Sequence, residues 1–175
     1  MRKVIILVFL LISVIASFAI AKEQENGWED IGKWLEWKAH TDLPKKQREV
    51  VDYFKKSEDI VEKVSNLWYE IPGTIHPKPS PAEGLKLIYE YIAEYKDIKP
   101  PKICRKHYEA SLAYLDIARE YQEMREKTKD VNELAKVNKK SVKYSDLRYS
   151  EFWCVLKEVG LFDNAEEEMK KLGLL

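Results

Sequence analysis

The chain has 175 residues, of which 30 are basic and 30 are acidic. Loss of Arg2 and Lys3 with a cleaved leader would leave 28 basic residues and a net charge of −2, which excludes a strong field for recruiting nucleic acid or an anionic membrane. The remainder, residues 22–175, has the length of a single domain.

The N-terminus has the pattern of a secretory signal peptide. Two basic residues precede an apolar run that extends with small interruptions to Ile20, and residues 19–21 (Ala-Ile-Ala) form a small-x-small cleavage signal. We therefore predict a signal peptide over residues 1–21 and an exported protein, periplasmic or extracellular. Retention of the run as an N-terminal anchor is the alternative, because its length is near the lower limit for a membrane span. No other membrane contact is expected.

The next segment, residues 22–43, is expected to hold a short tryptophan-rich helix. Aromatic side chains tend to anchor interfaces, so Trp34 and Trp37 are candidates for a partner surface, together with His76 in the proline-rich segment 72–81. The alternative is that the tryptophans simply pack against the rest of the protein. Four prolines and a glycine make segment 72–81 an extended connection rather than a helix.

Four longer helices are predicted in the remaining chain, because apolar residues recur at spacings of three and four and no stretch alternates with period two. Start signals mark each of them and a last short helix: Asp42 with Pro44, Ser80-Pro81 with Glu83, Pro100-Pro101, Asp130 with Glu133, and Asp163 with Glu166. Mostly short connections indicate an all-α, up-and-down four-helix bundle-like domain over residues 44–175, with short extra helices at the N- and C-termini.

Cys104 and Cys154 are the only two cysteines, and an exported chain with two cysteines favours a disulfide. Each lies 25 residues from residue 129, at the centre of the turn between the fourth and fifth helices. An antiparallel hairpin would therefore bring them to the same height. The helical wheel places both on the flanks of their helices, beside the core. We predict a Cys104–Cys154 disulfide.

His107 follows Cys104 by three residues, and a thiol and an imidazole one helical turn apart could hold a metal. If the cysteines pair with each other, Cys104 is not available as a ligand beside His107. His107 then stands alone on the apolar face of its helix, and we expect it to be a hydrogen-bonded core residue. The sequence has no Glu-x-x-His pair and no Cys-x-x-Cys-His motif, so neither a di-iron site nor covalent haem attachment is expected. We therefore predict no metal and no cofactor.

The fifth helix has a polar middle that includes Ser141. Residues equally far from the turn of an antiparallel hairpin face each other, so this polar middle is expected opposite tyrosines of the fourth helix. One interpretation is a small polar pocket inside the bundle, with candidate lining residues His107, Tyr114, Tyr121, Asn138 and Ser145. The other, which we favour on packing grounds, is that small serines make room for the tyrosines, whose hydroxyls take the polar partners.

No nucleophile elbow, P-loop, dinucleotide fingerprint or His-Glu-x-x-His motif occurs, so an enzyme is not expected. The run IKPPKICRKHYEASLAYLDIAREY resembles a helix opening of small secreted bacterial helical-bundle proteins, matching at Pro100, Pro101 and His107. The resemblance implies a helical fold and export, and no activity.

These observations favour an exported, non-catalytic helical protein that acts through protein–protein or cell-envelope contacts, with a partner of unknown identity. The alternative is a small-ligand or metal-binding helical bundle that uses His107, Tyr114 and Tyr121.

Overall fold

The computed structural model describes residues 30–68, 79–128 and 130–174, which form helices joined by short connections and no strands. The signal-peptide prediction for residues 1–21 lies outside the described residues. A helical segment, residues 30–39, comes first. The labelled elements that follow are α2 (Lys45–Trp68), α3 (Pro81–Lys96), the short 3-10 helix η1 (Lys102–Cys104), α4 (Arg105–Lys127), α5 (Val131–Glu158) and α6 (Phe162–Lys171).

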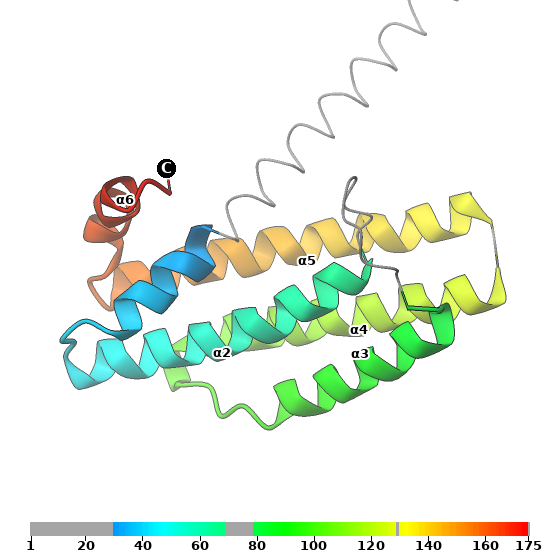
Figure 1. Ribbon diagram of the computed structural model, residues 1–175, viewed down its shortest axis with the longest axis horizontal. Coiled ribbons are helices and arrows are strands. Elements are labelled where there is room, and N and C mark those ends of the chain that lie inside the picture. The colour runs from blue at the N-terminus through cyan, green and yellow to red at the C-terminus, as the bar shows by residue number, and fades with distance from the viewer. Residues whose placement is uncertain (1–29, 69–78, 129, 175) are drawn as a thin grey trace, which may run out of the picture.

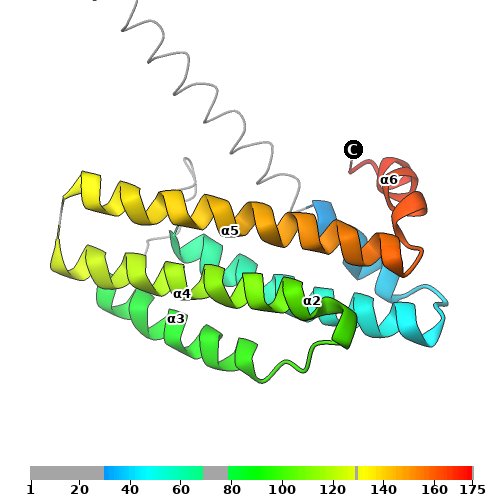
Figure 2. The same cartoon turned by 180° about the vertical axis from the view of Figure 1, so that it is seen from behind.

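Helices α2 to α5 form an up-and-down bundle in which each helix runs opposite to the one before it (Figure 1). Helix α4 packs against α2, α3 and α5, and seen from behind it lies between α3 and α5 (Figure 2). The short helices at the two ends of the chain, residues 30–39 and α6, lie at the same end of the bundle (Figure 1). The predicted all-α bundle is confirmed.

Two helix starts follow the predicted capping chemistry. Ser80 Oγ accepts a hydrogen bond from the Glu83 amide (3.3 Å), and Glu83 Oε2 accepts one from the Ser80 amide (2.9 Å), which is a complete capping box. Asp130 Oδ1 accepts from the Asn132 amide at 2.8 Å and caps α5. Local capping groups therefore set the beginnings of α3 and α5.

The predicted caps of two other helices are wrong. Helix α2 begins directly after Pro44, so Asp42 lies too far upstream to cap it. Helix α6 begins one residue before Asp163, which is therefore inside the helix and not its cap. The chain turns into α6 through Gly160, whose φ of 74° is readily adopted only by glycine. The backbone turn at the end of α5 therefore positions α6.

The core consists of two apolar clusters stacked along the bundle. One joins residues 30–39, the start of α2, the end of α5 and α6, and includes Trp34, Phe54, Phe152 and Met169. The other joins the end of α2 with α3, α4 and the start of α5, and includes Val64, Ile88, Tyr95, Leu115 and Val137. Polar side chains from α2, α3, α4 and α5 lie between them.

Glu168 of α6 holds the N-terminal helical segment. Its Oε2 accepts from Trp34 Nε1 at 3.0 Å, and its Oε1 accepts from Lys38 Nζ at 2.6 Å. Trp34 is fully buried and Lys38 is 7% exposed, so water would replace the carboxylate poorly as a partner of these donors.

Glu168→Ala is expected to lower the free energy of unfolding by about 2 kcal/mol, because it leaves the buried indole N–H and ammonium group without an acceptor. The measurement is urea denaturation followed by circular dichroism. Glu167→Ala is the matched control, since Glu167 is exposed and forms a surface ion pair with Lys171 in the next turn. Equal losses in the two variants would contradict the role of Glu168.

Candidate functional site

The side chains between the two apolar clusters form a polar layer across the bundle. We define this polar layer by its residues from four helices: Tyr53, Ser57 and Glu58 of α2, Tyr95 of α3, His107 and Ser111 of α4, and Arg148 of α5. They face one another because the buried stripe of each helix carries a polar residue at the same height in the bundle. His107 and Ser111 have no exposed surface, and Arg148 is 2% exposed.

His107 lies at the centre of the polar layer. Its Nδ1 is 3.0 Å from the Tyr53 hydroxyl, and its Nε2 is 3.2 Å from Glu58 Oε1. We assign Tyr53 as the donor to Nδ1, which leaves the ring proton on Nε2, facing Glu58. The contact between Nε2 and Oε1 is close but lacks hydrogen-bond geometry, and neither atom has another hydrogen-bond partner. The predicted hydrogen-bonded core histidine is therefore present, with one of its two nitrogens poorly satisfied.

Glu58 and Arg148 form an ion pair between α2 and α5. Arg148 Nη2 donates to Glu58 Oε2, and Arg148 Nε donates to Ser111 Oγ at 3.0 Å. The guanidinium also lies over the ring of Tyr114, 5.1 Å from its centroid. One buried cation thus connects α5 to both α2 and α4.

Burial and charge act in opposite directions on the pKa values of the layer. Burial favours the neutral acid of Glu58, but attraction by Arg148 and contacts with His107 outweigh it and lower the pKa of this carboxyl below its ordinary value. Burial lowers the pKa of His107, and the Glu58 carboxylate only partly opposes that effect. The layer therefore holds a carboxylate, a guanidinium and a neutral imidazole at neutral pH.

A chain of hydroxyls continues from His107 to α3. The Tyr53 hydroxyl is 3.5 Å from the Tyr95 hydroxyl, which is 2.9 Å from Ser57 Oγ. Burial raises the pKa values of both tyrosines, so both keep their protons throughout the physiological range. These hydroxyls are paired with one another, and none of them lines either of the two hollows described below.

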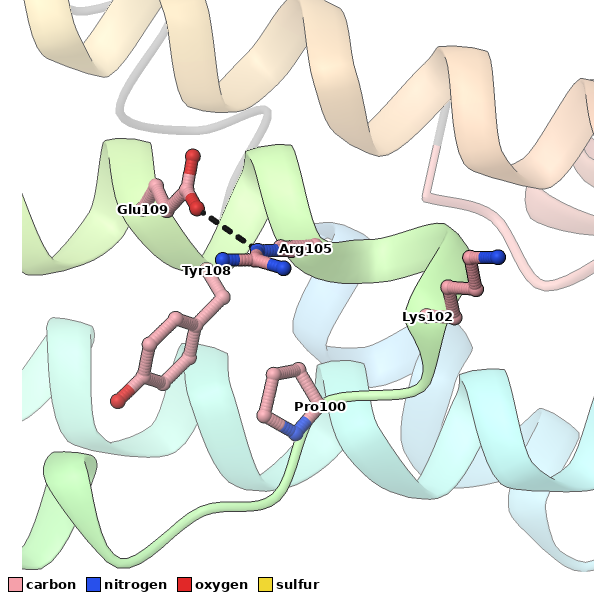
Figure 3. Close-up of a pocket in the computed structure, with 5 residues that line it drawn as sticks. All are labelled: Pro100, Lys102, Arg105, Tyr108 and Glu109. Carbon is pink, nitrogen blue, oxygen red and sulfur yellow. Dashed lines mark hydrogen bonds and ion pairs between the residues drawn. The ribbon is translucent and has the colours of Figure 1, made fainter.

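One hollow of the described surface lies beside the start of α4 (Figure 3). It measures about 430 Å³ and is lined by Pro100, Lys102, Arg105, Tyr108 and Glu109. Arg105 Nε donates to Glu109 Oε1 at 3.0 Å across its rim (Figure 3). A second hollow, between α4 and α5, is lined by Lys106, Glu109, Ala110, Tyr144, Leu147 and Glu151. Neither contains a residue of the polar layer or of the predicted pocket.

The predicted ligand pocket is not formed as a unit. His107 is in the polar layer, and Tyr114 lies beside it with its hydroxyl 3.1 Å from Ser65 Oγ. Tyr121 is half-buried against the second apolar cluster. Asn138 is exposed and Ser145 is half-buried, because the inward face of α5 passes through other positions. The interpretation that side chains fill this space fits the packing better.

The predicted partner surface is also divided. Trp34 is fully buried and offers no surface in this structure, because it packs in the first apolar cluster and donates to Glu168. Trp37, three residues further along the same helix, is 39% exposed. His76 lies outside the described residues.

The predicted Cys104–Cys154 disulfide is wrong, because both cysteines are free. The helix register was correct: Arg148 meets Ser111 and Lys140 meets Glu120, pairs that are equally far from the turn to within two residues. The predicted rotation of the two helices about their own axes was wrong. Cys104 points into the first apolar cluster, whereas Cys154 points to solvent.

The loss of the disulfide reopens the question of a metal at Cys104 and His107. Burial raises the pKa of the Cys104 thiol to about 12, so it stays protonated and is a poor metal ligand. Within the described part of the chain, no group of three or more His, Cys, Asp or Glu side chains is placed to hold a metal ion.

Sequence reasoning missed the two charged members of the layer, Glu58 and Arg148. Charged residues are dense along the whole chain, so neither stands out in the sequence. Arg148 nevertheless lies four residues before Phe152 and seven after Ser141, so it has the spacing of a buried stripe. That spacing was the available signal.

A row of three aromatic rings lies on the outside of α5 and at the start of α6. The centroids of Tyr149 and Trp153 are 5.9 Å apart, and those of Trp153 and Phe162 are 5.5 Å apart. Tyr149 is 38% exposed and Phe162 is 41% exposed, while Trp153 between them is half-buried. We call Tyr149, Trp153 and Phe162 the aromatic row. Contiguous exposed rings of this kind are typical of contact surfaces.

No helix in the described ranges combines the length and the apolar character needed to cross a membrane. Comparison with known proteins adds no relative: no protein-family model, no curated protein and no solved structure matches this chain.

Proposed function

We propose that this is an exported, non-catalytic helical protein that acts through contacts with another protein of the cell envelope. The observation that carries the proposal is the aromatic row, in which large rings are fixed in mutual contact on a helix surface yet remain partly exposed. Rigid aromatic side chains lose little conformational entropy on binding and give large contact areas, which is why they dominate interface energetics.

The interior supports the same proposal. The polar layer contains the imidazole and the buried charges that an enzyme would need, but its groups bond to one another and do not line either hollow. The alternative, a ligand- or metal-binding bundle around His107, Tyr114 and Tyr121, has less support because these side chains do not enclose a shared space. Export rests on the N-terminal sequence pattern. Mass spectrometry of the N-terminus of the natural protein tests it by showing whether the chain begins at Lys22.

Tyr149→Ala combined with Phe162→Ala is expected to abolish partner retention, because it removes the two most exposed rings of the row. The measurement uses the purified protein, immobilised, to retain proteins from envelope extracts of its host. A retained protein must then be purified and bind the wild-type chain directly, with at least about a tenfold weaker affinity for the variant, as expected of interface anchors.

Tyr89→Ala is the matched control. Tyr89 is an exposed aromatic residue on α3, and its hydroxyl donates to Glu123 at 3.0 Å. The control should bind as the wild type does, and all variants should keep their helical circular dichroism. If the aromatic-row variant binds a purified partner as tightly as the control does, the proposal is refuted.

A further inference from the structure

Ionisable side chains of the polar layer surround the imidazole of His107. His107 is faced by Tyr53 and Glu58 from α2, Tyr95 lies behind Tyr53 on α3, and Arg148 approaches from α5. The field of Glu151 on α5 also reaches the ring, more weakly. With His107 neutral, the buried charges are one carboxylate and one guanidinium, and they balance.

A proton on His107 would upset this balance. The layer would then hold two cations, His107 and Arg148, around the single carboxylate of Glu58. The added proton would go to Nδ1, which now accepts a hydrogen bond from the Tyr53 hydroxyl, so this buried hydrogen bond would be lost. His107 has no exposed surface and Arg148 is 2% exposed, and an uncompensated buried positive charge is strongly unfavourable.

The ion pair lies where side chains of α2 and α5 meet, and we call this contact the α2–α5 seam. The Glu58–Arg148 pair crosses it, and beside the pair the rings of Phe54 and Phe152 meet with centroids 4.6 Å apart. Phe54 also contacts the His107 ring edge-on at 4.9 Å. The imidazole therefore touches both the polar and the apolar contacts that close the seam.

We infer that His107 makes the α2–α5 seam acid-responsive: when His107 takes up a proton, the seam opens, and water reaches Arg148 and the apolar clusters on either side. The pH range follows from the direction of two shifts. The pKa of His107 in the folded protein is below its ordinary value of 6.5, chiefly because of burial, so the stability given by the neutral ring is complete above pH 6.5 and is lost as the pH falls below it. The pKa of Glu58 is below its ordinary value of 4.5, so its carboxylate stays ionised over this range.

Hydrogen exchange of backbone amides tests the inference on the protein purified from its host, at several pH values between about 7.5 and 5. Because one proton is taken up on opening, the opening equilibrium constant in α2 and α5, corrected for intrinsic exchange, should rise by up to about tenfold per pH unit. His107→Gln should remove this rise. His40→Gln is the matched control and should behave as the wild type, since His40 is exposed and pairs with Glu36 one turn away.

A second measurement keeps the inference testable if His107→Gln does not fold. The ring proton resonances of His107 in the wild-type protein should titrate with a midpoint below pH 6.5, in step with the loss of amide protection. A midpoint above 6.5 would overturn the inference. So would a pH response of the seam that is the same in wild type and His107→Gln.

Discussion

Arg148→Met is expected to lower the free energy of unfolding by about 3–5 kcal/mol. The substitution keeps most of the aliphatic volume but removes the guanidinium, so Glu58 remains as a buried carboxylate whose neighbour is a neutral histidine. Ser111 Oγ loses its donor as well. Since a domain of this size is stable by only about 5–15 kcal/mol, the loss should be plain in urea denaturation.

Two further variants separate the buried charge from the loss of a side chain. Arg105→Met removes an exposed arginine that pairs with Glu109, and it should cost less than about 1 kcal/mol. Adding Glu58→Leu to Arg148→Met removes the unpaired carboxylate and should recover most of the lost stability. If Arg148→Met were no more harmful than Arg105→Met, the polar layer would not hold the bundle together as described.

Trp34→Ala is expected to destabilise the protein by about 3–5 kcal/mol. Trp34 is the largest fully buried side chain, and its removal leaves a cavity between the N-terminal helical segment and the end of the bundle. Glu168 Oε2 also loses the hydrogen bond that it accepts from the indole N–H of Trp34. Thermal and urea unfolding of the variant measure the loss.

Trp37→Ala is the control within the same helix. Trp37 is 39% exposed, and its ring contact with the Lys38 ammonium, at 5.4 Å from the centroid, is of a weak kind, so a change below about 1 kcal/mol is expected. Similar losses in the two tryptophan variants would show that the N-terminal segment is not docked through Trp34. The two tryptophan variants also help to interpret the binding assays, because a loss of partner retention in Trp34→Ala would reflect unfolding.

The sequence predicts much of this fold because helix starts and stops depend on local chemistry. The capping box at Ser80 and the cap at Asp130 are short-range features, and both are found in the structure. The α4–α5 register follows from the position of one turn, and the Arg148–Ser111 contact confirms it. These features need no knowledge of distant contacts.

The rotation of α5 about its own axis does depend on distant contacts, and there the prediction fails. The buried positions of α5 include Val137, Ser141 and Arg148, whereas Asn138, a candidate lining residue of the predicted pocket, is exposed. Arg148 is buried only because Glu58, on another helix, neutralises it, and no local pattern reports such a partner.

The unequal placement of the two sulfur atoms limits how oxidants and electrophiles can affect this protein. The thiolate is the reactive form, and the Cys104 sulfur is both enclosed and held as the protonated thiol by a pKa of about 12. Cys154 alone lies at the surface. A sulfenic acid, a mixed disulfide with a small thiol, or a covalent link between two molecules would therefore form on the outer side of α5, one per folded chain, without disturbing the interior.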